Sequence, residues 1–148
     1  MQNETVGIAV KKLSNQYTRY MMNIKVKINE KVSGARDITG MQGWIIRYLF
    51  DRSGEDVFQK DIEKEFSIQR STATQILQLM EKNDLITRET CHYDGRQKTV
   101  HLTPKAIEIH RKAHDAIADA ERKVTKGISR ENLKTFFEVI DKISRNIQ

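Results

Sequence analysis

Short polar side chains gather on one side of a predicted helix in the middle of the chain, SIQRSTATQILQLMEKNDLI. Its apolar residues recur every three or four positions, as on a buried helix face: Ala73, Ile76, Leu77 and Met80. With Arg70 near the start, the opposite arc carries hydroxyls and amides in place of long charged side chains: Ser71, Thr74, Gln75 and Gln78. Hydroxyls and amides can hydrogen-bond base edges, so this arc has the chemistry to read the major groove of DNA.

A second candidate site is the stretch HYDGRQK, residues 92–98, which lies between two runs that alternate as strands do. Asp94-Gly95 favours a tight hairpin turn, and a turn alone would account for the glycine. A turn does not account for Arg96 and Lys98 beside it. We therefore expect strands over 85–91 and 98–103 with a charged tip between them.

Two strand registers fit this hairpin. A two-residue turn would pair Thr87 with Leu102 and set apolar residues opposite polar ones. A three-residue loop that ends in a left-handed Gly95 would pair Ile86 with Leu102 instead. We expect the second register, because it places two apolar residues on the same face.

Predicted helices precede and follow these two sites. An apolar stripe predicts a helix of about 25 residues from Val6. Thr39 to Gln42 forms a capping box before a helix that buries Trp44, Ile45, Tyr48 and Leu49. A short helix with Ile62 and Phe66 inward leads to the central helix. Three sequence signals mark the last two helices: Thr103-Pro104, Gly127 and Ser129.

Composition favours one helix-rich chain in the cytoplasm. It has 148 residues, one proline, 38% hydrophobic and 31% charged residues, and no apolar run long enough for a membrane span. The net charge of +6 is concentrated in residues 1–38 and 104–148. No nucleophile with a base, paired carboxylates or phosphate loop is visible, so we expect neither an enzyme nor a cofactor.

The apolar stripes at both ends of the chain exceed what one small domain can cover. The final stripe includes two aromatic and four aliphatic residues: Leu133, Phe136, Phe137, Ile140, Ile143 and Ile147. Large apolar faces are unfavourable when exposed to water, and a second copy of the chain can cover them. The sequence therefore predicts a homodimer.

The element order, the segment RSTATQILQLMEKNDLI and the hairpin motif D-x-R at 94–96 together resemble the MarR family of bacterial winged helix-turn-helix transcriptional regulators. The resemblance covers nearly the whole chain. It implies a mainly α fold with a small β-hairpin wing: a DNA-binding domain at 39–103, and a helical dimerisation domain formed by 1–38 and 104–148. It also implies a repressor that responds to a ligand and binds a pseudo-palindromic operator of double-stranded DNA as a homodimer.

The resemblance assigns roles to individual residues. Five would face the major groove: Arg70, Ser71, Thr72, Thr74 and Gln75. Arg96 would enter the minor groove with Asp94 holding its guanidinium, while Arg88 and Lys98 would contact phosphates. The family usually has glycine in place of Asp84, but Asn83 or Asp84 can adopt the left-handed conformation that this turn needs.

An effector is a further implication of the resemblance, commonly a small aromatic or phenolic compound or an oxidant. Residues that could line its pocket come from two predicted helices: Tyr17, Tyr20, Met21, Trp44, Arg47 and Tyr48. The alternative reading of each is ordinary core.

Three alternatives stay open at this point. His110 and His114, four apart on a helix, could respond to a metal or be a solvated pair; we expect no metal. Cys91, the one cysteine, could sense oxidants or be inert filler in a strand. The winged domain could also serve as a protein-interaction module that binds no DNA.

Overall fold

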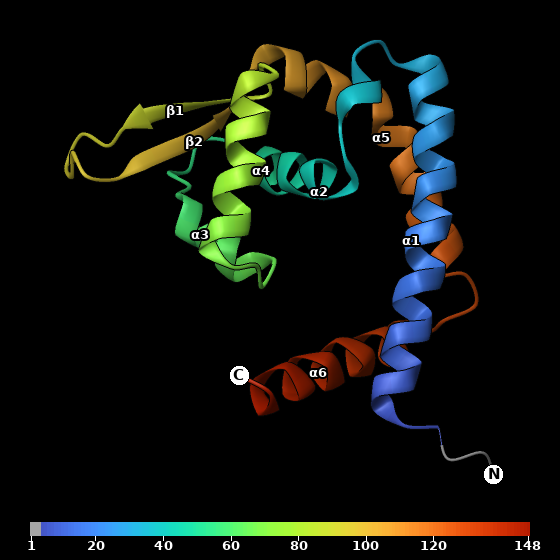
Figure 1. The fold of residues 1–148 in the computed structure, drawn as a ribbon. Coiled ribbons are helices and arrows are strands. Elements are labelled where there is room, and N and C mark those ends of the chain that lie inside the picture. Colours follow the sequence, from blue (N-terminus) through green and yellow to red (C-terminus); the bar gives the residue numbers. More distant parts are fainter. Residues whose placement is uncertain (1–3) are drawn as a thin grey trace. The chain divides into compact units, whose positions relative to one another are not determined.

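The computed structural model describes residues 4–148, so the first three residues of the predicted flank 1–38 lie outside it. The order of elements is the predicted one, with one short 3-10 helix added (Figure 1). The mainly α fold with a small hairpin is confirmed. The elements are α1 Val6–Lys31, η1 Ala35–Asp37, α2 Gly40–Asp51, α3 Gln59–Glu65, α4 Arg70–Lys82, β1 Ile86–Thr90, β2 Lys98–Leu102, α5 Pro104–Val124 and α6 Arg130–Asn146.

The first helix confirms the predicted start at Val6 and a length of 26 residues. Thr5 caps it through a hydroxyl that accepts a hydrogen bond from the Ile8 amide at 3.4 Å. After α1 the chain turns at Gly34, which has φ +82°. A Cβ there would also lie 3.2 Å from the Ile109 Cδ1 atom, so both conformation and space favour glycine. This turn brings the end of α1 against α5.

The second helix begins with the predicted capping box. The Thr39 hydroxyl accepts from the Gln42 amide at 3.4 Å, and the Gln42 side chain accepts from the Thr39 amide at 3.1 Å. Ile45 and Leu49 are buried as predicted. Trp44 and Tyr48 are only half-buried, because they lie at the edge of the core, where their rings meet other aromatic side chains. Both residues were predicted to be buried, and they are buried only in part.

A single hydrophobic core fills the centre of the chain. Ile45, Ile62 and Leu77 have no exposed surface, and each such side chain contributes about 1.5–3 kcal/mol relative to exposure. The same cluster includes Val32 before α2 and Ala106 in α5. The core therefore extends across both predicted domain boundaries, at 39 and at 103.

The chain divides into two compact units, Met1–Ala116 and Ile117–Gln148. The second unit contains the end of α5, a turn at Gly127 with φ +80°, and α6. Ser129 caps α6, as predicted, by accepting a hydrogen bond from the Asn132 amide at 3.1 Å. Across residues 4–148, no helix is long and apolar enough to cross a membrane.

Candidate nucleic-acid interface

Helices α3 and α4 form a helix-turn-helix. Ile62 of α3 and Ala73 of α4 have no exposed surface, so the two helices share the core. The chain reverses between them at Ser67, which has φ +49°. The Ile68 amide then donates to the Glu63 carbonyl at 3.0 Å and closes the turn. The sequence did not indicate this left-handed serine, because serine seldom adopts that conformation.

Helix α4 presents its polar arc to solvent. Ala73, Leu77 and Met80 are fully buried and Ile76 is half-buried, which confirms the predicted inward arc. Thr74 is half-buried, and the rest of the predicted outward set is exposed: Arg70, Ser71, Thr72, Gln75 and Gln78. The helix thus offers a continuous row of hydroxyls and amides on one face.

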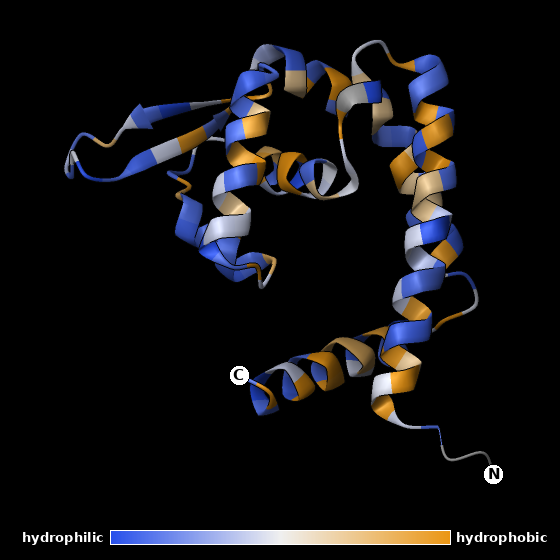
Figure 2. Cartoon of the chain, viewed as in Figure 1, coloured by the Kyte–Doolittle hydropathy of each residue, from blue (hydrophilic) through white to orange (hydrophobic). Residues whose placement is uncertain are grey.

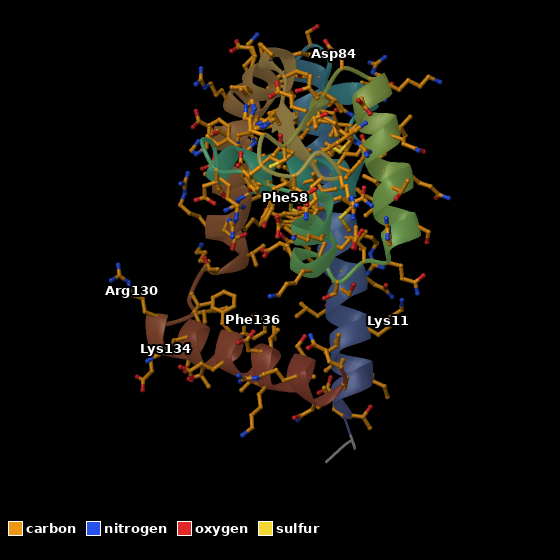
Figure 3. All side chains as sticks on the ribbon, turned by 90° about the vertical axis from the view of Figure 1, so that its left-hand side faces the viewer. Lys11, Phe58, Asp84, Arg130, Lys134 and Phe136 are labelled. Carbon is orange, nitrogen blue, oxygen red and sulfur yellow. The ribbon has the colours of Figure 1, made fainter. Side chains whose placement is uncertain are left out.

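The turn after α4 fixes where the hairpin begins. Asp84 adopts φ +58°, the left-handed conformation expected at Asn83 or Asp84, and Figure 3 labels it beyond the end of the helix. Its carbonyl accepts a hydrogen bond from the Thr103 hydroxyl at 2.6 Å. That hydroxyl in turn accepts from the Ala106 amide at 3.2 Å, so it also caps α5. One threonine therefore joins the end of α4 to the start of α5.

The hairpin extends from the core as a wing (Figure 1). Ile86 pairs with Leu102, so the predicted register is confirmed. Regular pairing ends at Thr90 and Lys98, which makes both strands slightly shorter than predicted. An additional bridge joins Phe58 to Thr99, which the sequence pattern did not predict.

The tip of the wing differs from the predicted three-residue loop. The Cys91 amide donates to the Gln97 carbonyl at 2.9 Å, and the Gln97 amide donates to the Asp94 carbonyl at 3.1 Å. Gly95 is not among the glycines with positive φ, so the predicted left-handed conformation was wrong. The longer connection spreads the reversal over more residues, and the turn from Asp94 to Gln97 forms without a left-handed glycine.

Asp94 contacts the backbone of Arg96 and not its guanidinium. Its Oδ1 atom accepts a hydrogen bond from the Arg96 amide at 3.0 Å, which holds the turn. Arg96 and Lys98 are both exposed. Both cations are therefore accessible at the wing, while Asp94 shapes the loop that carries them.

Arg88 lies differently from the other predicted DNA contacts. Its side chain is 18% exposed, and its Nε atom lies 3.6 Å from the Glu81 carboxylate at the end of α4. The Nε and Nη2 atoms are buried and have no hydrogen-bond partner among the described residues. Arg88 therefore contacts the end of α4, and these two nitrogens are inaccessible to a phosphate.

The structure brings together part of the predicted effector pocket. The rings of Tyr17 and Trp44 are stacked with centroids 6.3 Å apart. Tyr48 instead meets Phe66 edge-on at 5.8 Å, with the Arg52 guanidinium 4.2 Å above its ring. Burial raises the pKa of Tyr48, and the nearby Arg52 cation partly opposes that rise.

The remaining predicted pocket residues lie on the same two helices. Tyr20 and Met21 follow Tyr17 by one turn of α1 and are half-buried. Arg47 lies between Trp44 and Tyr48 on α2, and its Nε atom is 3.8 Å from the Asp51 carboxylate. The aromatic residues thus fall into two groups, one beside α1 and one beside the end of α3.

His110 and His114 are not a solvated pair. His110 is 8% exposed and lies against the Phe50 ring at 4.4 Å, whereas His114 is exposed. Burial lowers the pKa of His110, against an opposing effect of Asp51. Within the described residues, no group of three or more His, Cys, Asp or Glu side chains could hold a metal ion. Cys91 is buried at the base of the wing tip.

A helix-turn-helix followed by a projecting hairpin defines the winged helix-turn-helix class of DNA-binding proteins. A family model described as MarR family matches residues 36–97. The crystal structure of the transcription regulator MarR from Oenococcus oeni PSU-1 is 32% identical, with a TM-score of 0.79 over 95% of this chain and 99% of that one. The chain belongs to the MarR family and is a DNA-binding transcription regulator.

Two further structures share the fold. The S. aureus MepR–DNA complex has a TM-score of 0.82 at 20% identity and covers 100% of both chains. The PcaV transcriptional regulator from Streptomyces coelicolor, in complex with its natural ligand, has a TM-score of 0.72 at 19% identity over 97% of this chain and 94% of that one. Members of this family are regulators that act as dimers, and are not enzymes.

Proposed function

We propose that this regulator is a ligand-responsive cytoplasmic repressor, and that its homodimer binds a pseudo-palindromic operator. In this proposal residues 39–103 bind DNA, and residues 1–38 with 104–148 form the dimer. The observation that carries it is the arrangement of α4, whose apolar arc is locked in the core while its hydroxyls and amides face solvent. A purely structural surface helix would more often show long charged residues there.

The proposed base contacts come from the first turns of α4: Arg70, Ser71, Thr72, Thr74 and Gln75. Gln69 precedes this helix without a side-chain hydrogen bond to its first amides. Those amides and the positive end of the helix dipole can bind a DNA phosphate. Phosphate contacts would then set the position of α4, and the side chains would select the sequence.

We assign the wing residues separate roles. Exposed Arg96 would enter the minor groove, where the narrow groove concentrates negative potential, with Asp94 holding the loop. Exposed Lys98 would contact a phosphate. Arg88 would hold the wing against α4 through Glu81, because its buried nitrogens cannot reach a phosphate.

The proposed dimer interface uses the apolar faces of α1 and α6. Neither helix buries a single residue within one chain. Figure 2 shows apolar positions recurring along both helices. On α6 these include Phe136, Phe137 and Ile140, which are 45%, 61% and 45% exposed. Dimerisation would remove this surface from water and set two copies of α4 about 34 Å apart, one turn of DNA.

We further propose an aromatic or phenolic effector near the two groups of aromatic residues: Tyr17, Tyr20, Met21, Trp44, Arg47 and Tyr48. The stacked rings of Tyr17 and Trp44 offer a flat apolar surface, and Arg47 offers a cation. PcaV, which shares the fold, was solved with its natural ligand. Binding would shift the dimer between states with different spacing of the two α4 helices.

Repression is the proposed direction of control. A dimer with two half-sites one turn apart covers roughly two turns of DNA. Such a dimer would exclude the polymerase from any promoter that it overlaps, and effector binding would release it.

The test is selection from a pool of random DNA duplexes, followed by titration of the enriched duplex at several salt concentrations. We expect a two-fold symmetric motif and an affinity that falls steeply with salt. Gln75→Ala should change the selected motif. A wild-type protein that enriches no sequence and binds duplexes without salt dependence would contradict the proposal, and would favour a protein-interaction module.

A further inference from the structure

Gln59 at the start of α3 joins the two helices of the helix-turn-helix. Its amide nitrogen lies 2.9 Å from the Thr74 hydroxyl oxygen and 3.0 Å from the Glu63 carboxylate. It also lies 3.4 Å from the Arg70 carbonyl oxygen in the first turn of α4. Gln59 and Thr74 are half-buried, so the hydrogen bond between them is partly shielded from water.

The neighbours of Gln59 determine which way its amide is oriented. The Glu63 carboxylate and the Arg70 carbonyl can only accept hydrogen bonds, so the NH2 group and not the carbonyl oxygen must face them. The NH2 group has two hydrogens, and its two shorter contacts accept them: the Glu63 carboxylate at 3.0 Å and the Thr74 hydroxyl at 2.9 Å. The Thr74 oxygen acts as an acceptor inside the protein, and its own hydrogen is left for a different partner.

The hydrogen of Thr74 has no acceptor among the described residues. A threonine within a helix often donates to the carbonyl four residues earlier. Thr125 does so, because its hydroxyl donates to the Glu121 carbonyl at 3.0 Å. For Thr74 the corresponding carbonyl is that of Arg70, and the two do not form this hydrogen bond; the Thr74 hydroxyl pairs with Gln59 instead.

We propose that Gln59 is a specificity-determining residue that acts through Thr74. By donating to the hydroxyl, it makes Thr74 a hydrogen-bond donor toward the DNA. The base atom that receives this hydrogen would be an acceptor, such as guanine O6 or N7, adenine N7 or thymine O4. This inference rests on the proposed entry of α4 into the major groove.

The experiment compares motifs selected from random duplexes by the wild type, Gln59→Ala, Thr74→Val and the double variant. We expect Gln59→Ala and Thr74→Val to lose preference at the same pair of symmetric positions. Each should bind the wild-type duplex roughly 2- to 10-fold more weakly, the range for one hydrogen bond. The double variant should be no weaker than Thr74→Val alone, and Thr74→Ser should retain the motif.

Two controls accompany the selection. Gln16→Ala changes an exposed glutamine in α1 and should leave the motif unchanged. Far-ultraviolet circular dichroism and a thermal melt establish that each variant is folded before its motif is compared. The salt dependence of Gln59→Ala should equal that of the wild type, because the proposed role involves no phosphate.

The outcomes separate this inference from the proposed function. A wild type that enriches no motif would overturn the proposed function. A wild-type motif that persists in Gln59→Ala would overturn only the role of Gln59. A double variant that binds more weakly than Thr74→Val would also overturn it, since Gln59 would then contact DNA by itself.

Discussion

Apolar residues are buried in the centre of the chain, whereas those of helices α1 and α6 remain partly or fully exposed. In the centre, Ile62, Leu77 and Met80 have no exposed surface. By contrast, the 26 residues of α1 and the 17 residues of α6 include none that is buried. Figure 3 shows Lys134 and Phe136 extending from different sides of α6, so polar and apolar faces are separated on that helix.

This difference indicates which property each region controls. The centre buries its apolar residues within a single chain, and this packing holds the polar arc of α4 in place. In the proposed dimer, a second copy of the chain covers the apolar faces of α1 and α6, and this contact would set the spacing between the two copies of α4. A ligand that alters this assembly could change DNA binding without changing any base-contacting residue.

Ile140→Asp should have the largest effect of the proposed substitutions, because it places a charge on the apolar face of α6. A two-fold interface contains the same residue twice, so the change would bring two unpaired carboxylates into it. Each would cost on the order of 3–5 kcal/mol, the range for a buried unpaired charge. We expect a monomer by analytical ultracentrifugation and loss of DNA binding.

Thr135→Asp is the matched control, since it adds the same charge at an exposed polar position of α6. It should remain dimeric. Equal sedimentation of the two variants and the wild type would remove α6 from the interface.

Leu77→Ala tests the core in the centre of the chain. Leu77 is fully buried, so the change should reduce the free energy of unfolding by about 2–5 kcal/mol. Leu79→Ala removes the same atoms two residues away, where the side chain is 44% exposed. This change should alter the free energy of unfolding by roughly 0.5 kcal/mol or less. Urea unfolding at equal protein concentration provides the measurement, and similar losses would contradict the assigned inward face of α4.

Arg96→Ala should weaken binding to the selected duplex by about 1–3 kcal/mol while the dimer remains intact. The Arg96 side chain is exposed at the wing tip, so its removal should leave the fold and the dimer in place. A gel-shift titration gives the affinity, and sedimentation gives the assembly state. An unchanged affinity would exclude the wing tip from DNA binding.

Lys98→Ala and Arg88→Gln distinguish a phosphate contact from a structural cation. Removing one phosphate contact should reduce the slope of log affinity against log salt by about one unit. We expect this for exposed Lys98 and not for Arg88, whose Nε and Nη2 atoms are buried. A reduced slope for Arg88→Gln would restore its expected role as a phosphate contact.

His110 should give the smallest effect, a dependence of folding stability on pH. Burial lowers its pKa below 6.5; His114 and Arg47 lower it further, and Asp51 opposes them. The unfolded chain therefore binds the proton more readily, so stability is present above pH 6.5 and is lost as the pH falls toward the lower folded pKa. Urea unfolding across this range should show the loss. His110→Leu should strongly reduce this loss. His114→Gln should reduce it only slightly, because His114 lowers the pKa of His110 less than burial does. Equal curves for wild type and His110→Leu would contradict this role of His110.

Local patterns predicted the elements of this fold because their causes are local. The capping box at Thr39, the hairpin register and the inward arc of α4 each depend on residues a few positions apart. Arg88 could also have been placed from its pattern. It lies two residues from buried Ile86 on the same strand and so shares the inward face.

Other features depend on distant contacts or on the exact path of a loop. Gln59 and Thr74 are separated by a turn, and no periodicity indicates that their side chains meet. The conformation of Gly95 depends on how many residues the wing tip uses, and a two-residue signal cannot specify that number. The burial of His110 against Phe50 similarly requires the packing of α2 on α5.

The most direct test of a homodimer on a pseudo-palindromic operator is selection of random duplexes by the wild-type chain, with the assembly state measured on the same sample. We expect one dimer per enriched duplex and two symmetry-related half-sites with centres about 10 base pairs apart. Enrichment of a single half-site by a monomer, or no enrichment, would contradict it.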